Sequence, residues 1–195
     1  MFAVRHGETE WSRDGRHTGL TDIPLTDAGR AAAERLAPTL RDRAFALVLT
    51  SPLSRARDTA SLAGYPDATV DDDLCEWNYG DYEGRTTADI RTERADWFLW
   101  DDGVPNGESI AAVAARCDRV IARVRSTEGD VLAFAHGHVL RVLAARWIDQ
   151  EPGFGRHVML SPATLSILSS EHDVPALDAW NAPTTRASNR SRRRS

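Results

Sequence analysis

The sequence of 195 residues contains no lysine, and all 24 of its basic residues are arginine. This absence excludes mechanisms that depend on a lysine amine: a P-loop lysine, a Schiff base and a lysine general base. Long apolar runs are also absent, because none exceeds six residues, whereas a membrane-spanning helix needs about 20. We therefore expect a protein that does not cross a membrane.

Cysteine is scarce as well. Cys75 and Cys117 are the only two, which is typical of reduced thiols in a reducing compartment. The segment 1–5 lacks the charged and long apolar regions of a signal peptide. Both observations favour a cytoplasmic location, with one disulfide between the two cysteines as the alternative.

The charge is distributed unevenly along the chain. The formal net charge is −5, yet residues 186–195 contain five arginines and no acid, so the remainder is more acidic than the total. Such an acidic domain is a poor binder of nucleic acid. Beyond Ala182 there is no apolar side chain larger than alanine or proline. We therefore predict one domain over 1–182 and a disordered, Arg-rich tail over 183–195.

Within the domain, buried-strand patterns alternate with helix patterns. Strands are expected at 2–4, 45–49 and 131–135, with a half-buried one at 164–169. The helices are expected to begin near Asp27, Ser54, Ile110 and Val139, and Pro38 should kink or end the first of them. This alternation predicts an α/β fold with a mostly parallel central sheet.

Ligands of such folds bind outside the carboxyl ends of the parallel strands. The segments at these ends contain two His-Gly pairs, at His6 and His136, and the arginines Arg5 and Arg55. Two guanidinium groups form an anion site, and a neutral imidazole is a competent nucleophile at phosphorus. The second imidazole, if protonated, would stabilise the oxygens of the transferring group. The pattern therefore predicts phosphoryl transfer.

An acid is needed to protonate the leaving alkoxide. Glu76 is the best candidate, because apolar and aromatic neighbours would favour its protonated form by desolvation. The alternative is an ordinary loop carboxylate.

His136 and His138, with His6 and Glu8, are an alternative set of metal ligands, but no HExxH or CxxC motif is present. A Ser-His-Asp hydrolase is disfavoured because there is no GxSxG motif.

These residues resemble the signatures of the histidine phosphatase superfamily, which includes the cofactor-dependent phosphoglycerate mutases. The resemblance covers residues 3 to about 145, and any one motif is weak whereas the whole set in order is specific. The matching segments are Arg5–Trp11, Asp22–Thr26 with Gly19 and Gly29, Ser51–Ala56 with Thr59 and Ala60, Glu76 with Tyr79, Gly80, Glu83 and Gly84, Gly107–Ser109, and Ala135–His138.

The resemblance implies a role for each matching residue. His6 would be the phosphorylated nucleophile, Glu76 the proton donor and His136 the second stabilising histidine. Arg5 and Arg55 would hold the phosphate. The resemblance places the Gly137 backbone, the Thr18 hydroxyl and Gly19 at the same phosphate. It also implies an α/β/α sandwich with no metal and no cofactor.

Two departures from the family pattern bear on specificity. Ser12 stands where many members have asparagine, and it can still hydrogen-bond phosphate. The basic residues and the long basic insertion of the mutases are missing after Glu76, where Trp77 follows and an aromatic, acidic segment occupies 95–101. A pocket walled by Trp77, Trp97 or Trp100 would suit a broader range of phosphoesters, with core packing as the alternative role.

The segment 16–22 is similar to the phosphatase branch, which includes broad-range acid phosphatases and sugar-bisphosphate phosphatases. We therefore expect a metal-independent, acid phosphatase-like phosphomonoesterase that forms a phosphohistidine. Its expected partners are small phosphorylated metabolites such as phosphosugars, and inorganic phosphate, without nucleic acid or membrane. The alternatives are a cofactor-dependent phosphoglycerate mutase and a non-catalytic phosphate-binding module. The sequence leaves the oligomeric state open, a dimer included.

Overall fold

The computed structural model describes residues 1–183, and its centre is a sheet of six strands. The strand order is β3-β2-β4-β1-β5-β6. The strands are β1 (Phe2–Arg5), β2 (Leu47–Thr50), β3 (Thr69–Val70), β4 (Val131–Ala135), β5 (Thr164–Glu171) and β6 (Val174–Pro183).

Strand direction follows from the connections. β3, β2, β4 and β1 are mutually parallel, because helices connect them, whereas β5 runs antiparallel to β1 and pairs with β6 in a hairpin. The central strands β1 and β4 are apolar on both faces, and all five residues of β4 are buried. The expected α/β fold with a mostly parallel sheet is confirmed.

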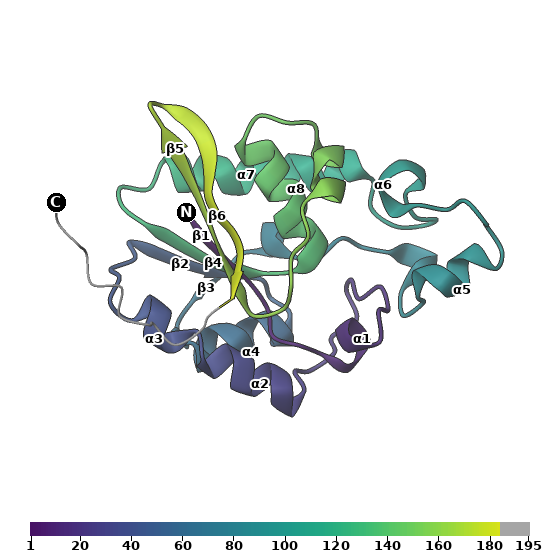
Figure 1. The fold of residues 1–195 in the computed structure, drawn as a ribbon, viewed down its shortest axis with the longest axis horizontal. Coiled ribbons are helices and arrows are strands. Elements are labelled where there is room, and N and C mark those ends of the chain that lie inside the picture. The colour runs from purple at the N-terminus through teal and green to yellow at the C-terminus, as the bar shows by residue number, and fades with distance from the viewer. Residues whose placement is uncertain (184–195) are drawn as a thin grey trace, which may run out of the picture.

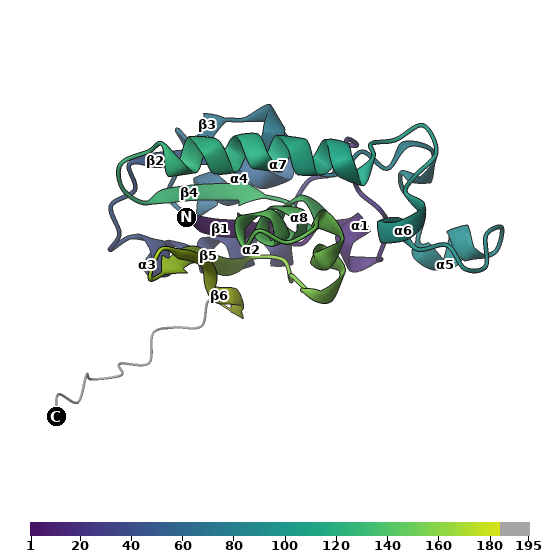
Figure 2. The ribbon, with the colours of Figure 1, turned by 90° about the horizontal axis from the view of Figure 1, so that it is seen from above.

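Helices cover both faces of the sheet, as Figure 1 shows. α7 (Ile110–Arg125) and α8 (Gly137–Trp147) pack on one face, and α2 (Asp27–Glu34), α3 (Ala37–Leu40) and α4 (Ser54–Leu62) on the other. The short helices α1 (Glu10–Arg13), α5 (Thr87–Arg91) and α6 (Leu99–Asp102) lie beyond the sheet, at the end to which β1 leads (Figure 2). The sheet is therefore the middle layer of three.

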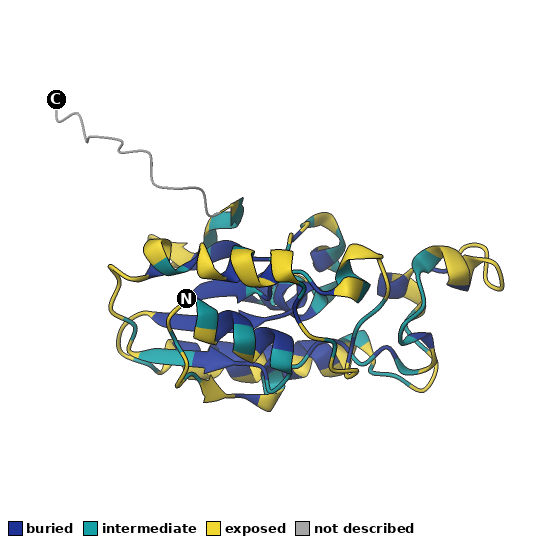
Figure 3. Cartoon of the chain, turned by 90° about the horizontal axis from the view of Figure 1, so that it is seen from below, coloured by how far each residue is buried: buried dark blue, intermediate teal, exposed yellow. Residues whose placement is uncertain are grey.

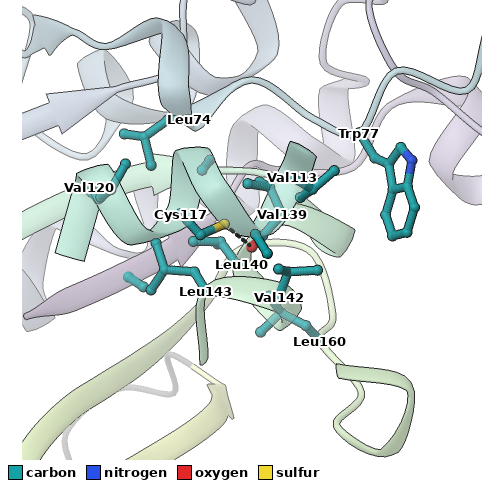
Figure 4. Close-up of a cluster of buried hydrophobic side chains, with 14 of the residues drawn as sticks. Leu74, Trp77, Val113, Cys117, Val120, Val139, Leu140, Val142, Leu143 and Leu160 are labelled. Carbon is teal, nitrogen blue, oxygen red and sulfur yellow. Dashed lines mark hydrogen bonds between the residues drawn. The ribbon is translucent and has the colours of Figure 1, made fainter. Parts of the chain in front are cut away.

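Two apolar clusters separate these layers. One lies between the sheet and the helices α7 and α8, and it includes Val113, Cys117 and Val139, shown in Figure 4. The other lies beneath α2, α3 and α4 and includes Leu36 and Phe134. Buried strands thus run between helices whose outer faces are exposed (Figure 3).

Helix α7 shows how local sequence positions an element. Its apolar residues recur every three or four positions, which gives one buried stripe. The Ser109 side chain accepts a hydrogen bond from the Ala112 N–H and so caps the first turn. The helix expected after Ser109 is confirmed.

Other boundaries differ from the sequence-based expectation. The first predicted helix is two helices, since α2 ends at Glu34 and Pro38 lies in the first turn of α3. Proline fits there because the first N–H groups of a helix have no partner within it. β3 and β6 were not predicted. β5 is buried through most of Thr164–Leu168 rather than alternating, because β1 and β6 flank it.

The boundary of the predicted domain falls inside β6. Pro183 is the last residue of that strand and pairs with Thr164, so it belongs to the sheet and not to a tail. The rest of the tail predicted over 183–195, residues 184–195, lies outside the described residues. Within residues 1–183, no helix has the length and apolar character to cross a membrane.

Candidate active site

The carboxyl ends of three parallel strands meet at one edge of the sheet. Arg5 in β1 is paired with Ala135 in β4, and Thr50 in β2 with Phe134. Two further backbone hydrogen bonds continue this register, from the His6 N–H to the Ala135 carbonyl and from the Ser51 N–H to the Phe134 carbonyl. The sequence positions 6, 51 and 136 are thereby brought together, as the strand-end rule predicts.

The His6 side chain is held in one tautomer. Its Nδ1 lies 2.6 Å from the Gly7 carbonyl, which only accepts, so Nδ1 donates its proton and Nε2 retains the lone pair. Burial, together with the nearby charges of Arg55 and Arg5, lowers the pKa of His6 well below its ordinary value. His6 is therefore a neutral imidazole with a nucleophilic Nε2.

The loop that follows His6 is fixed by close backbone packing. The Gly7 N–H donates to the Thr59 Oγ1 at 2.9 Å, and that hydroxyl donates to the Arg55 carbonyl in α4. A Cβ on Gly7 would lie 2.5 Å from the Gly29 carbonyl oxygen, and a Cβ on Gly29 only 2.1 Å from the Glu8 oxygen. Glycine is required at both positions because the N-terminus of α2 touches this loop.

His136 lies beside His6 with the opposite tautomer. Its Nδ1 accepts a hydrogen bond from the Arg55 Nε at 3.1 Å, so Nε2 carries the proton and donates to the Ser51 Oγ at 2.7 Å. The two imidazole ring centroids are 5.0 Å apart. Burial and the charge of Arg55 lower the pKa of His136 well below its ordinary value. These contacts favour a neutral His136, and its protonation during phosphoryl transfer stays a prediction.

The Arg5 guanidinium is only partly satisfied by the protein. One guanidinium nitrogen donates to the Leu160 carbonyl, yet its Nε is buried without a hydrogen-bond partner, alone in this among side-chain atoms of residues 1–183. Burying a charged donor without an acceptor is costly. Gly137 is adjacent, since a Cβ there would lie 3.4 Å from the Arg5 Nε. An anion placed here would satisfy this atom.

Arg55 is fully buried behind the cavity wall. Its guanidinium donates to the carbonyls of Thr18, Gly19 and Thr21, at distances of 3.3, 2.7 and 3.0 Å. Asp22 lies 4.0 Å from the same guanidinium and also accepts hydrogen bonds from the Ser54 N–H and hydroxyl. Asp22 therefore positions both Arg55 and the start of α4, a role that the sequence did not reveal.

The Glu76 carboxylate lies at the N-terminus of α8. One oxygen accepts from the N–H groups of Trp77 and Val139, at 2.9 and 2.8 Å, and the other from the His138 N–H at 3.0 Å. The N–H groups of His138 and Val139 are among those of the first helical turn that have no partner within the helix. The side chain is 5% exposed and lines the same cavity as Arg5 and His6. Its orientation is therefore fixed toward the reacting groups.

A cavity of about 520 Å³ opens onto these groups. Ser12, Thr18 and Gly137 line it, as expected of phosphate-binding residues. The hydroxyls of Ser12 and Thr18 already have partners, because the first bonds to the Thr9 backbone and the second donates to the Arg16 carbonyl. Their binding of phosphate stays a prediction.

Three expected binding residues do not line the cavity: Arg55, which is buried behind its wall, Gly19 and Trp77. Gly19 does not line the cavity, and it contacts Arg55 through its carbonyl and Glu83 through its N–H. Trp77 was expected at the substrate, but its side chain is fully buried and its Nε1 donates to the Glu108 carbonyl (Figure 4). Indole packing and a satisfied N–H make Trp77 a core residue. Trp97 and Trp100 do line the cavity.

Sequence reasoning missed most of the cavity's outer wall. Most of the lining residues that it missed are aromatic or basic: Arg16, His17, Tyr79, Arg91, Phe98, His138, Arg141 and Arg156. Arg141 could have been found, because it follows Gly137 by four positions and so shares its helix face. No group of three or more His, Cys, Asp or Glu residues in the described part of the chain could hold a metal ion.

The paired histidines, the arginines and the buried carboxylate on an α/β sheet edge define a phosphoryl-transfer site. The chain belongs to the histidine phosphatase superfamily, since the model of branch 1 of that superfamily matches residues 1–183. The named relatives are mainly phosphatases, and the chain is accordingly a phosphatase of the histidine phosphatase type.

Three comparisons show how close the relatives are. An acid phosphatase of Mycobacterium tuberculosis is 40% identical over 181 residues, which cover 91% of this chain and 89% of the relative. A sedoheptulose 1,7-bisphosphatase of Saccharomyces cerevisiae is 40% identical over 177 residues, covering 74% and 65%. A solved structure of a Mycobacterium tuberculosis protein superposes with a TM-score of 0.90 at 39% identity, covering 94% and 97%.

Proposed function

We propose that the chain is a metal-independent phosphomonoesterase that acts on small phosphorylated metabolites, phosphosugars among them, through a phosphohistidine at His6. The carrying observation is the fixed tautomer of His6, whose lone pair resides on Nε2 beside the unpartnered Nε of Arg5. A phosphate bound by Arg5 would stand next to an unprotonated nucleophile. This combination supports covalent catalysis at phosphorus.

In the first step, the His6 Nε2 attacks phosphorus in line with the ester oxygen. The P–N bond forms as the P–O bond breaks, and Glu76 transfers a proton to the leaving alkoxide. Arg5, the N–H of Gly137 and the Nε2–H of His136 would stabilise the phosphoryl oxygens. The His136 ring would turn from Ser51 toward the phosphoryl group. The negative charge of the bound phosphate would then favour the protonated form of His136.

In the second step, water replaces the alcohol. Glu76 accepts a proton from the water, whose oxygen attacks phosphorus while the P–N bond to His6 breaks. The products are inorganic phosphate and the starting imidazole, so atoms and protons balance over the cycle. Inorganic phosphate is accordingly the second small molecule that the site would bind.

The test compares wild type with His6→Ala, using p-nitrophenyl phosphate at acid to neutral pH in excess EDTA. Wild type should retain its activity in EDTA, and His6→Ala should lose essentially all of it because no other group supplies the nucleophile. A brief incubation with radiolabelled substrate should label wild type alone, with a label that is lost in acid and survives alkali, as a P–N bond does. His157→Ala, at an exposed histidine outside the cavity, is the matched control.

Two results would contradict the proposal. Activity abolished by EDTA would require a metal, and an active His6→Ala variant would assign the nucleophile elsewhere. Conversion of 3-phosphoglycerate to 2-phosphoglycerate, stimulated by the bisphosphorylated intermediate, would instead establish the mutase alternative. Binding of phosphate without any turnover would leave the non-catalytic module.

We also propose a cytoplasmic location. Cys75 and Cys117 are both unpaired thiols, and burial raises the pKa of Cys117 to about 12. Thiols that persist without a disulfide fit a reducing compartment. Fractionation of cells that express the protein, with detection in the cytoplasmic fraction, tests this location.

A further inference from the structure

The cavity extends well beyond the reacting groups, and its wall is strongly basic. Five arginines line it, against the single carboxylate of Glu76. This contrasts with the formal net charge of −5 for the chain. Only one of the five, Arg5, is next to His6 and the N-terminus of α8. The other four face the space that the alcohol part of a substrate would occupy.

Arg141 is the best positioned of these four. It lies in α8, four residues after Gly137, so it is on the same helix face and about 6 Å further along the axis. Its Nε donates to the Gly155 carbonyl at 2.9 Å, and one terminal nitrogen donates to the Arg156 carbonyl at 3.3 Å. The Trp100 ring lies 4.8 Å beneath the guanidinium carbon. The side chain is thus held in place before any ligand binds.

Arg141 also lacks a counter-ion. No carboxylate forms an ion pair with it within residues 1–183, whereas neighbouring Arg156 is paired with Asp101. Arg141 is partly buried, and this burial lowers its pKa below the ordinary value. The positive charge of nearby Arg5 lowers the pKa further, whereas Tyr79 and Glu76 raise it. An unpaired, desolvated guanidinium is costly to the folded state. A ligand anion would offset that cost.

We propose that Arg141, stacked on Trp100, binds a second anionic group on the alcohol part of the substrate. The preferred substrates are then phosphomonoesters that carry a further phosphate or a carboxylate a few carbons from the ester. This inference rests on the proposed phosphomonoesterase function. Arg16 and Arg91, which are exposed and line the same cavity, add positive potential to it.

The experiment compares kcat/KM within two matched pairs of substrates. Glycerol 3-phosphate and 3-phosphoglycerate differ by a carboxylate, and fructose 6-phosphate and fructose 1,6-bisphosphate by a phosphate. Wild type should favour the more acidic member by roughly tenfold or more, beyond the factor of two from two hydrolysable esters. Arg141→Gln should remove most of this ratio. Arg146→Gln, also in α8 but bonded to Asp118 away from the cavity, should keep it.

A structural role predicts a different pattern. If Arg141 only supported residues 152–157, its loss would lower kcat/KM for both members of a pair equally, and the inference would be wrong. A wild-type ratio near one in both pairs would overturn it as well. Arg141→Lys keeps the charge without the planar fork and should restore part of the ratio, which separates charge from folding damage. A preference confined to one pair identifies the second group as carboxylate or phosphate.

The same assays separate the two proposals. An enzyme that hydrolyses p-nitrophenyl phosphate through His6 but shows no preference for acidic substrates retains the phosphomonoesterase function and loses the second anion site. A protein that hydrolyses none of these esters loses the proposed function, and the inference with it.

Discussion

At the residue scale, two histidines with the same sequence context have different chemistry. His6 and His136 each follow a parallel strand and precede a glycine. A carbonyl faces the Nδ1 of His6, whereas the Arg55 Nε faces the Nδ1 of His136. The first contact leaves a nucleophilic Nε2, and the second leaves an Nε2–H donor. In the proposed mechanism, one hydrogen-bond partner therefore decides which histidine attacks and which stabilises.

These contacts predict opposite tautomers that persist at mildly acidic pH. As the pH is lowered from 8 to 5.5, His6 should remain in the Nδ1–H form and His136 in the Nε2–H form, because burial and Arg55 lower both pKa values well below 6.5. Nuclear magnetic resonance of nitrogen-15-labelled imidazoles measures this directly. Titration of either ring near pH 6.5 in the ligand-free protein would contradict the prediction.

Lowered pKa values of buried histidines also predict how the free energy of unfolding changes with pH. A histidine whose folded pKa is depressed stabilises the protein fully above its unfolded pKa, near 6.5, and loses that contribution as pH falls toward the folded value. For His17 the folded pKa is about 4, so its window runs from about 6.5 down to about 4. The free energy of unfolding in urea should therefore decrease below pH 6.5, and His17→Asn should show a smaller decrease.

At the element scale, the N-terminus of α8 organises the acid. Its second and third N–H groups bind the two oxygens of Glu76, and its first residue, Gly137, borders Arg5. The end of one helix thus holds the carboxylate beside the place where a phosphate would bind. Four residues later the same helix supplies Arg141. One element therefore connects the reacting groups with the outer cavity.

This arrangement predicts a dependence on the leaving group. Glu76→Gln should lower kcat/KM for glycerol 3-phosphate by about 100-fold or more, because an alkoxide must be protonated as it leaves. Hydrolysis of p-nitrophenyl phosphate should fall much less, since p-nitrophenolate leaves without a proton. The ratio of kcat/KM is the proper measure, because it reports the steps up to phosphorylation of the enzyme. Equal losses would contradict the acid role, and Glu93→Gln, at an exposed carboxylate, serves as control.

At the scale of the whole molecule, an acidic protein encloses a basic cavity. The Arg5 Nε has no hydrogen-bond partner and Arg141 has no counter-ion, and both features lower the stability of the folded protein. Net negative charge elsewhere keeps the positive potential local to the cavity mouth. An anion bound there should therefore stabilise the whole fold, because it binds the native state alone.

Inorganic phosphate should accordingly raise the melting temperature. At about 100 times Kd the stabilisation is about 2.7 kcal/mol, or about 5–10 °C for a chain of this size. Differential scanning fluorimetry with phosphate, against chloride at equal ionic strength, measures it. An equal rise in chloride would show a salt effect without a site. Arg5→Gln should lose the phosphate-specific part of the rise.

The sequence predicted the fold class well because its signals are local. The run at 131–135 is apolar on both faces, and the stripe after Ser109 has helical spacing, so both elements were found. β3 has only two residues, both exposed, and β6 carries mixed burial, so neither has a periodic signal. β3 forms by pairing with β2, from which it is separated in the sequence by a helix. β6 forms by pairing with β5 in a register that contains irregularities. Pairing of this kind is decided by tertiary contacts.

The sequence by itself predicted that Arg5, His6 and His136 lie at one edge of the sheet, because the carboxyl ends of neighbouring parallel strands share an edge and the His-Gly motifs mark those ends. It also determined that no lysine takes part. Only the tertiary structure decided the tautomers, the burial of Trp77 in the core and the contact of Gly19 with Arg55. It likewise brought Arg141 and Trp100 to one cavity. The physical reason is that hydrogen-bond partners and side-chain neighbours come from segments far apart in the chain, and no local pattern encodes them.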